Sequence, residues 1–252
     1  MRIAILTNAF PPKARGGAGQ IAKIQADWWV AHGHEVRVFT VEPFAQDQTS
    51  GHEVVTFKAR TTRKFADLGR SNALLRLLFH FEDLAPNPWA FDRVTEWRPD
   101  VLVTHNLTGC GWGTPQLIQK SGVRWVHVLH DIQMFEPSGQ RFYGEKHYGL
   151  KKAWRRFWAA RRRRAFGKPD AVSSPTRWLL EQHRIHGLLG NASGQVVPNP
   201  VPRMESAPAR DGVAYLGRLS KDKGVQCLLE AWDFIEDKPG RLFLVGDGPL
   251  RD

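Results

Sequence analysis

Two cations five residues apart give the clearest chemical signal in the chain. Arg218 and Lys223 lie in the segment Gly217–Gly224, which follows the apolar run Val213–Leu216 and precedes a helix-like run. Arginine offers a planar fork to two phosphate oxygens, lysine is a mobile point charge, and a helix N-terminus adds its positive dipole end. The spacing therefore predicts an anion site suited to a diphosphate. The alternative is a pair of solvated loop cations.

A glycine-rich loop near the N-terminus offers a second place for an anion. Gly16 and Gly17 lie in the loop Asn8–Gln20, which follows the apolar run Arg2–Thr7 and leads into a helical pattern. Glycines at such a place let backbone N–H groups approach an anion at a helix N-terminus. The spacing differs from the G-x-G-x-x-G fingerprint of dinucleotide-binding proteins. The alternative interpretation is a flexible turn between a strand and a helix.

A histidine stands at the end of a strand-like run in the middle of the chain. His130 and Asp131 follow the run Arg124–Leu129, and the carboxyl ends of strands are where a parallel sheet binds ligands. An imidazole there can donate a hydrogen bond to a sugar hydroxyl or shuttle a proton. The alternative is a histidine held by loop carbonyl groups, and we interpret His127 as structural. No residues have metal-ligand spacing, so we expect no structural zinc.

Most of the positive charge is concentrated in one segment. The 252 residues carry a net charge of +11, and residues 151–168 hold nine cations and no acid. Eight of these cations are candidates for contact with an anionic membrane or another anion: Lys151, Lys152, Arg155, Arg156, Arg161, Arg162, Arg163 and Arg164. The alternative is a core helix with a solvated basic face. No nucleic-acid-binding module accompanies the charge, so we expect no nucleic-acid partner.

Alternating strand and helix patterns must position these residues. Strands are expected at Arg2–Thr7, Glu35–Thr40, Glu53–Lys58, Val101–Thr104, Arg124–Leu129, Ala171–Ser173 and Gln195–Val197. Helices are expected at Gly17–His32, Asn72–Leu84, Lys146–Phe166 and Pro175–His186. The alternation predicts an α/β fold with a doubly wound, Rossmann-like parallel sheet that helices cover on both faces.

A proline-containing stretch divides the chain. Val201–Arg210 carries Pro202 and Pro208 with little apolar content, which indicates an interdomain linker. We therefore expect an N-terminal domain at residues 1–205 and a second unit at residues 206–252. The second unit reads as one strand–helix–strand motif of about 40 residues, too small to be stable alone. It either docks on the first domain or forms the start of a larger one.

Composition bears on where the protein works. No apolar run approaches the roughly 20 residues of a membrane-spanning helix, and the N-terminal run lacks the cleavage site of a signal peptide. Cys110 and Cys227 form no motif and are expected to be free thiols in a reducing cytoplasm. We therefore expect a cytoplasmic protein, peripheral at the inner face of the membrane if the basic helix binds lipid.

Taken in order, these motifs resemble those of the family-4 glycosyltransferases, which have the GT-B fold. The resemblance runs the whole length of the chain, and its most specific part is Gly217–Gly224 followed by Leu244–Pro249. The other segments that carry it are Arg2–Thr7 with Gly16 and Gly17, Ala31–Val38, His130–Asp131, Ser174–Leu179 and Val197–Val201.

The resemblance implies transfer of a sugar from a nucleotide-sugar to an acceptor, with retention of configuration and without a metal or other cofactor. Arg218 and Lys223 would hold the donor diphosphate, and the first loop would approach it at Gly16 and Gly17. His130 would be the catalytic residue, bonded to the transferred sugar in a cleft between two domains. Asp131 and Asn199 are further candidates for contact with the sugar or the acceptor, a saccharide or a lipid-linked saccharide.

The chain departs from the family pattern in two places. Pro200 stands where the family commonly has glycine, and the chain ends before a pair of glutamates that would bind the donor sugar and ribose. We therefore expect a fragment that transfers sugar poorly or not at all by itself. The alternatives are a non-catalytic module that binds an acceptor or a membrane, or one half of a split glycosyltransferase. A nucleotide-binding oxidoreductase is disfavoured because the G-x-G-x-x-G fingerprint is lacking.

Overall fold

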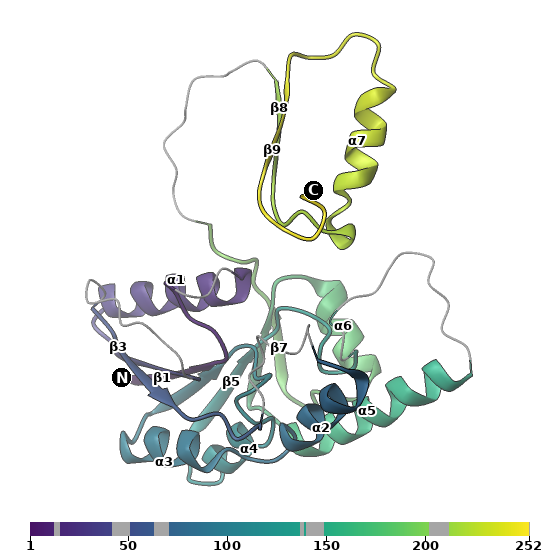
Figure 1. Cartoon of the computed structure of the whole chain (residues 1–252). Helices are drawn as coiled ribbons and strands as arrows, with labels where there is room; N and C mark the ends of the chain where they lie inside the picture. The colour runs from purple at the N-terminus through teal and green to yellow at the C-terminus, as the bar shows by residue number, and fades with distance from the viewer. Residues whose placement is uncertain are drawn as a thin grey trace. The chain divides into compact units, whose positions relative to one another are not determined.

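The computed structural model describes residues 1–12, 16–41, 51–62, 71–136, 139, 149–201 and 212–251. The contacts within the chain separate it into two units, with a division after Pro202 (Figure 1). The predicted boundary at residue 205, together with Pro202 and Pro208 of the predicted linker, lies outside the described residues. Each unit is therefore described by itself.

The first unit is built on a seven-stranded parallel sheet in the order β3-β2-β1-β4-β5-β6-β7. The strands are β1 Arg2–Thr7, β2 Glu35–Val41, β3 Glu53–Phe57, β4 Val101–Thr104, β5 Arg124–Val128, β6 Ala171–Ser174 and β7 Ser193–Val196. The predicted α/β class and parallel sheet are confirmed. The strand order reverses between β1 and β4, and the carboxyl ends at such a switch point are where these sheets bind ligands.

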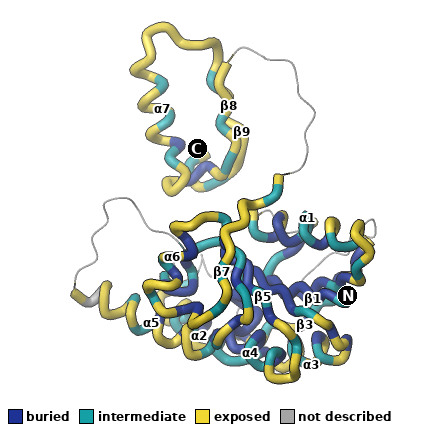
Figure 2. Tube along the Cα trace, turned by 180° about the vertical axis from the view of Figure 1, so that it is seen from behind, coloured by how far each residue is buried: buried dark blue, intermediate teal, exposed yellow. Residues whose placement is uncertain are grey.

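Period-two alternation along the strands supplies two separate apolar layers. Ile3 and Ile5 of β1 belong to a cluster that includes Ala22 and Ala26 of helix α1 (Gly17–Ala31). The intervening Ala4 and Leu6 belong to a larger cluster, to which α3 (Pro88–Glu96), α4 (Thr114–Gln119), α5 (Leu150–Phe166) and α6 (Arg177–Ile185) contribute. Figure 1 shows α1 on the side of the sheet opposite to α3 and α4, and Figure 2 shows the buried residues concentrated in the strands.

Helix boundaries follow local capping. The Asn72 side chain accepts a hydrogen bond from the Leu75 N–H at the start of α2 (Ala73–Glu82), and Thr176 caps α6 in the same way. The long basic helix is described from Leu150, so the predicted start at Lys146 lies outside the described residues. Helices α3 and α4 were not expected from the sequence. Both are short and carry proline in the first turn, where its missing N–H costs nothing.

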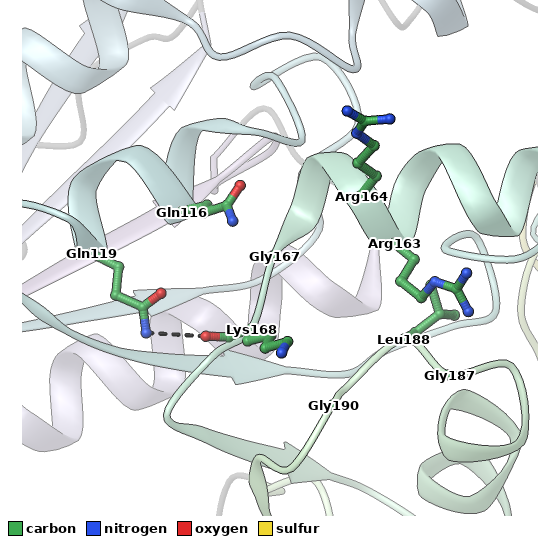
Figure 3. Close-up of a pocket in the computed structure, with 9 residues that line it drawn as sticks. All are labelled: Gln116, Gln119, Arg163, Arg164, Gly167, Lys168, Gly187, Leu188 and Gly190. Atoms are coloured by element: carbon green, nitrogen blue, oxygen red, sulfur yellow. Dashed lines mark hydrogen bonds between the residues drawn. The ribbon is translucent and has the colours of Figure 1, made fainter.

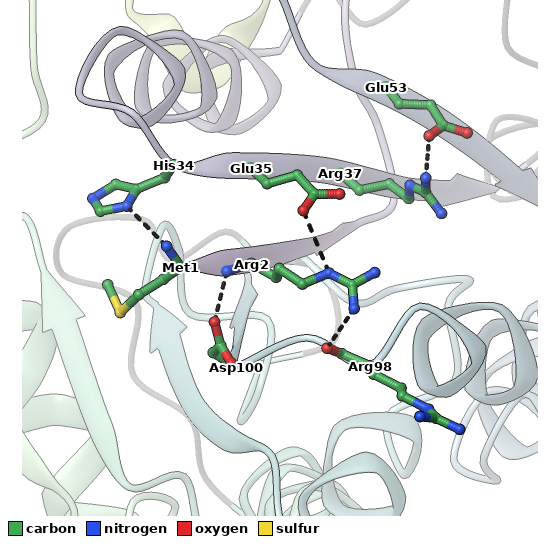
Figure 4. Close-up of polar contacts among 8 residues, drawn as sticks. All are labelled: Met1, Arg2, His34, Glu35, Arg37, Glu53, Arg98 and Asp100. Carbon is green, nitrogen blue, oxygen red and sulfur yellow. Dashed lines mark hydrogen bonds and ion pairs between the residues drawn. The ribbon is translucent and has the colours of Figure 1, made fainter.

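Polar contacts join four strands at their amino ends, on the edge of the sheet where the chain begins (Figure 4). The Arg2 N–H donates to Oδ2 of Asp100 at 2.7 Å, and the Arg2 guanidinium lies 3.5 Å from the Glu35 carboxylate. Arg37 of β2 pairs with Glu53 of β3. The contacts of Arg2 with Glu35 and of Arg37 with Glu53 join residues paired in the strand register, so they support that register at the edge opposite to the carboxyl ends.

The second unit is a small strand–helix–strand motif. Its elements are β8 Val213–Leu216, the short 3-10 turn η2 Lys221–Lys223, α7 Val225–Asp233 and β9 Leu242–Val245. The two strands pair in parallel, as the sequence predicts. Figure 2 shows this unit exposed over most of its length. Leu216 is 83% exposed and Phe234 is 87% exposed, so much of the apolar surface of this motif is uncovered.

Candidate functional site

The loops after β1, β4 and β5 are joined to one another at the carboxyl edge of the sheet. The backbone N–H of Asn8 donates to the Asn106 carbonyl at 2.9 Å, and the Asn8 side-chain amide donates to the Thr108 carbonyl at 3.1 Å. The Thr108 hydroxyl then donates to Oε1 of Gln133 at 2.8 Å. Side chains on these loops are therefore held at the switch point of the sheet.

Two histidines meet at this edge. His105 directly follows β4, His130 lies two residues beyond β5, and Nδ1 of His105 is 2.8 Å from Nε2 of His130. The rings are stacked with centroids 5.1 Å apart and planes 23° apart. Burial lowers the pKa of His130 to about 4, and burial together with the neighbouring histidines holds the pKa of His105 well below its usual range. Both rings are therefore neutral near pH 7.

The sequence predicted His130 but not His105. The sequence did contain a signal for His105, because this histidine directly follows the apolar run Val101–Thr104, as His130 follows a strand-like run. Its relation to His130 depends on the pairing of β4 with β5, which the sequence does not state. His127 is buried and hydrogen-bonded at 2.7 Å to the Thr104 hydroxyl, which also accepts a bond from the Trp125 indole N–H. These contacts agree with its structural interpretation.

Asp131 has its contacts within the loops that carry the histidines. Its Oδ1 accepts a hydrogen bond from the Gln133 N–H at 2.8 Å. Burial raises the pKa of the Asp131 carboxyl, and the bonds from Gln133 and from the Asn106 side chain oppose that shift. The carboxylate thus helps to hold the loops after β4 and β5. Its predicted contact with a sugar or acceptor stays a prediction.

Gly16 and Gly17 occupy the N-terminus of α1, with Gly16 as the cap residue at φ −86°. A Cβ placed on either glycine would meet no heavy atom within 4 Å. Neither the backbone conformation nor the packing of the described chain therefore requires glycine here. The space beside these glycines can admit a ligand close to the backbone.

Asn199 is not brought to the histidine pair. It is exposed, and it follows β7, the edge strand that lies two places from β5 in the sheet. It shares the carboxyl edge with His130 but not the same pair of loops. A contact of Asn199 with sugar or acceptor stays a prediction.

The basic helix α5 is less uniform than its sequence indicates. Five of its predicted contact cations are exposed: Lys152, Arg156, Arg161, Arg163 and Arg164. Arg155 is half-buried and pairs with Glu136 at 2.7 Å, and the side chain of Lys151 lies outside the described residues. The predicted membrane or anion contact is wrong for Arg162, because only 1% of this residue is exposed and it cannot face a membrane.

Arg162 lies among aromatic rings and acids. Its guanidinium is 5.0 Å from the ring centroid of Trp112 and 5.8 Å from that of Trp158. Burial lowers the pKa of Arg162 to about 10, while Asp83 and other acids oppose that shift. Asp83 accepts hydrogen bonds from the N–H groups of Gly109 and Gly111 at 2.9 and 3.0 Å. Burial raises the pKa of Asp83 to about 7, against those bonds and the nearby guanidinium.

A basic pocket of about 570 Å³ opens at the opposite edge of the sheet (Figure 3). Its lining residues are Gln116, Gln119, Arg163, Arg164, Gly167, Lys168, Gly187, Leu188 and Gly190. They come from the segments before β5, β6 and β7, so the pocket lies at the amino ends of these strands. Figure 3 shows Arg163 extending towards Leu188 and Arg164 pointing away from it.

In the second unit, the predicted cations stand on a turn that backbone contacts hold in place. Arg218 and Lys223 are exposed, and Gly224 adopts the left-handed conformation at φ +70° as the cap of α7. The Leu219 N–H donates to the Asp247 carbonyl at 2.9 Å. A Cβ on Gly246 would lie 1.8 Å from the Gly217 carbonyl oxygen, so the two glycine loops of this unit approach too closely for a side chain.

Within the part of the chain that the structure describes, no three His, Cys, Asp or Glu residues gather as a metal site. Within the same ranges, no helix is long and apolar enough to cross a membrane. Cys110 is buried and Cys227 is exposed, and both are free thiols as predicted.

A family model described as a glycosyl transferase 4-like domain matches residues 16–200, which include the histidine pair. The chain belongs to this family. The predicted resemblance to family-4 glycosyltransferases is thereby confirmed. Arg218 and Lys223 lie beyond the matched residues of this glycosyl transferase 4-like protein.

Two curated relatives and one solved structure extend the comparison. An uncharacterized 42.6 kDa protein in the cps region of Klebsiella pneumoniae is 20% identical over 234 residues, covering 89% of this chain and 63% of that protein. WcaI of Escherichia coli K12, provisionally assigned as a colanic acid biosynthesis glycosyl transferase, is 24% identical over 277 residues, covering 98% of this chain and 66% of WcaI. The chain thus spans about two thirds of the length of the curated relatives it matches.

Sucrose-phosphate synthase from Thermosynechococcus elongatus has a solved structure similar to this one. The TM-score is 0.64 at 19% sequence identity, and the match covers 100% of this chain and 64% of that structure. At this identity the likeness concerns the fold alone. It agrees with the GT-B fold predicted for this glycosyl transferase 4-like protein.

Proposed function

We propose that this protein takes part in transferring a sugar from a nucleotide-sugar to an acceptor, with retention of configuration at the sugar. The observation that carries the proposal is the neutral histidine pair at the switch point of the sheet, in which His105 is buried and His130 is part-buried, within the residues that match the family. His130 is the member that bonds to a hydroxyl of the transferred sugar. A neutral imidazole can do so without placing a charge beside the reacting carbon.

Two further sets of residues complete the proposed donor contacts. Gly16 and Gly17 let the donor diphosphate approach the backbone at the start of α1, where no Cβ intervenes. Arg218 and Lys223 of the second unit bind a donor diphosphate and stabilise the charge that develops on it as the sugar leaves. The chain itself supplies these roles, and no metal or other cofactor is needed.

We also propose that the second unit is completed by further elements, either from a longer polypeptide or from a separate chain. Large apolar side chains on all three of its regular elements are exposed, including Leu216, Leu229 and Phe243. Exposed apolar surface of this extent marks an interface. The completing elements would supply the carboxylates that hold the donor sugar and ribose. This 252-residue chain alone would then transfer sugar slowly or not at all.

Binding of nucleotide-sugars tests the donor site. Calorimetric titration with UDP-, GDP-, ADP- and dTDP-sugars is run on this chain and on the longest product of its gene. We expect one nucleotide class to bind, and Arg218→Ala or Lys223→Ala to weaken that binding about tenfold or more, because each removes a charge-assisted phosphate contact. Lys221→Ala is the matched control, since Lys221 is an exposed cation of the same turn.

Two results would contradict the donor proposal. One is the absence of binding by every sugar nucleotide in the panel to both proteins. The other is an equal loss of affinity in the Lys221 and Lys223 variants, which would indicate non-specific attraction to the positive turn.

An anionic lipid surface is the second partner that we propose, consistent with a lipid-linked acceptor. Trp154 on α5 is 47% exposed beside the exposed cations of that helix, a combination suited to a membrane interface. Flotation with liposomes of neutral lipid, or of neutral lipid with phosphatidylglycerol, tests it. We expect recovery only with the anionic lipid, and loss of recovery on changing Lys152, Arg156 and Arg161 to Gln.

The matched control for the lipid test changes three exposed cations that do not belong to α5, Arg93, Lys120 and Arg124, to Gln. Equal recovery with neutral and anionic vesicles would contradict membrane contact through α5. Equal losses in the two triple variants would show that net charge, rather than this helix, governs recovery.

A further inference from the structure

We infer that His105 is a positioning residue that holds His130 in the Nδ1–H tautomer, so that His130 presents a hydrogen-bond donor to its ligand. The inference rests on the proposed role of His130 in sugar binding, and it adds the direction of that hydrogen bond. His105 is completely buried and contacts His130, so we assign it a positioning role rather than contact with substrate.

The hydrogen bond between the rings allows two proton arrangements. Both imidazoles are neutral, so the bond between Nδ1 of His105 and Nε2 of His130 contains one proton. In the first arrangement His105 donates from Nδ1, its Nε2 is bare, and His130 carries its proton on Nδ1. In the second, His130 donates from Nε2, its Nδ1 is bare, and His105 carries its proton on Nε2.

The surroundings of His105 distinguish these arrangements. Its Nε2 is buried and has no hydrogen-bond partner among the described residues. The second arrangement would place an N–H at that atom with nothing to accept it. Orphaned buried N–H groups are rarer than under-satisfied buried acceptors. The first arrangement leaves only a bare lone pair there, so it is the one that we assign.

The assignment fixes what His130 can do at the edge of the sheet. His105 engages Nε2 of His130, which leaves Nδ1 as the ring nitrogen for a ligand. With its proton on Nδ1, His130 donates to an oxygen of the ligand, such as a sugar hydroxyl. A histidine whose other nitrogen is engaged by a fixed donor keeps this tautomer. The geometry needed comes from the neighbouring strands β4 and β5, in which Thr104 is paired with His127.

Nitrogen NMR on the whole chain tests the tautomer directly. With ¹⁵N-labelled histidine at pH 7, long-range proton–nitrogen spectra distinguish a protonated ring nitrogen from a bare one, and His130→Gln identifies the signals of His130. We expect a protonated Nδ1 and a bare Nε2. A protonated Nε2 on His130 in the unaltered protein would overturn the inference.

Two substitutions at His105 separate positioning from simple space-filling. His105→Phe fills the site without a donor, whereas His105→Asn can place its amide N–H where Nδ1 stood. We expect His130 to move to the Nε2–H form in the Phe variant and to keep the Nδ1–H form in the Asn variant. The Nδ1–H form persisting in a folded Phe variant would overturn the role of His105. If the Phe variant does not fold, the Asn variant provides the test. A shift of His130 to the Nε2–H form in a folded Asn variant would overturn the role of His105.

Ligand binding by the His105 variants tests the positioning role of His105 and the proposed sugar contact of His130 separately. We expect His105→Phe to weaken binding of the nucleotide-sugar about five- to tenfold, the effect of one hydrogen bond, and to leave binding of the free nucleotide unchanged. His105→Asn is expected to restore most of the loss. The expected tautomers with unchanged nucleotide-sugar binding would support the positioning role and contradict the proposed sugar contact of His130.

Discussion

The two candidate binding regions of this chain are built in opposite ways. The histidine pair lies at the end of a seven-stranded sheet, on loops that are bonded to one another and backed by a buried acid and a buried arginine. Arg218 and Lys223 stand exposed on a two-stranded motif whose apolar residues are largely uncovered. A hydrogen bond of defined direction needs a rigid, desolvated setting, whereas a grip on a diphosphate can use solvated charges.

The largest expected effect comes from breaking the buried support of the first region. Asp83→Ala removes the acceptor of the Gly109 and Gly111 N–H groups and the acid that acts most strongly on the buried Arg162 guanidinium. Losing one partner of a buried ionic network costs about 3–5 kcal/mol. Urea unfolding followed by tryptophan fluorescence would measure the loss. Asp92→Ala, on the exposed face of α3, is the control and should change stability by less than about 0.5 kcal/mol.

A similar loss in the Asp92 variant, or a loss below about 1 kcal/mol in the Asp83 variant, would contradict this account. Asp83→Asn adds a useful intermediate. It retains one acceptor oxygen for the loop N–H groups but removes the charge beside Arg162, so its stability should lie between those of the unaltered protein and the Ala variant.

The next prediction concerns the second region. Gly246→Ala places a Cβ against the Gly217 carbonyl oxygen, at a separation that the backbone cannot accommodate without moving. We expect the pairing of β8 and β9 to be lost, because the glycine loops lie at the ends of these strands. Amide hydrogen exchange should then accelerate about a hundredfold or more over residues 213–245 and remain unchanged in β1, β4 and β5. Uniform acceleration in both regions would show that they unfold as one unit.

Acidification should destabilise the first unit and not the second, because the buried histidines all belong to the first unit. Burial lowers the pKa values of His80, His130 and His183 to about 4, and those of His105 and His127 also fall well below the usual range. Between pH 6.5 and 4 the unfolded chain binds protons that the folded first unit does not. The free energy of unfolding therefore falls as the pH falls, by about 1.4 kcal/mol per pH unit for each uncompensated proton.

Two carboxyl groups oppose this trend. Burial raises the pKa of Asp83 to about 7, so its folded form binds a proton between pH 7 and about 4 that the unfolded chain lacks, and acidification favours folding at that site. Burial also raises the pKa of the Asp131 carboxyl, with the same sign. Five histidines outweigh these two carboxyl groups. Residues 203–252 contain no histidine, so hydrogen exchange at pH 7 and pH 5 should show the loss of protection in the sheet of the first unit. A free energy of unfolding that is constant from pH 7 to pH 5 would contradict the prediction.

The comparison also shows what sequence patterns can predict. Each of the seven strands predicted from the sequence overlaps a strand of the parallel sheet, because buried strands such as β1 and β4 read as continuous apolar segments. The largely exposed edge strand β7 (Ser193–Val196) has little apolar content, and its start was predicted two residues too late, at Gln195. Helices α3 and α4 were missed, since each is short and offers little periodicity. His105 was missed for a different reason. Its importance arises from the adjacency of β4 and β5, a long-range pairing that local patterns do not contain.

Arg162 could have been recognised. It lies four residues after Trp158 and four before Phe166, and all three side chains are buried on one stripe of α5. The run of four arginines gives a strong charge signal, which obscures the four-residue spacing of Trp158, Arg162 and Phe166. The sequence also predicted the strand–turn–helix setting of Arg218 and Lys223, the proposed donor-binding cations, and that setting is present in the second unit.

The smallest expected change in stability is at Gly17, and it sharpens the contrast with Gly246. Gly17→Ala introduces a Cβ into open space at the first residue of α1, where the backbone has no need of glycine. Alanine is the better helix former, so stability should be unchanged or rise by up to about 1 kcal/mol. If the space is reserved for a diphosphate, nucleotide-sugar affinity should fall while stability does not. Unchanged affinity in the folded variant would remove this glycine from the donor site and leave the diphosphate to the cations of the second unit.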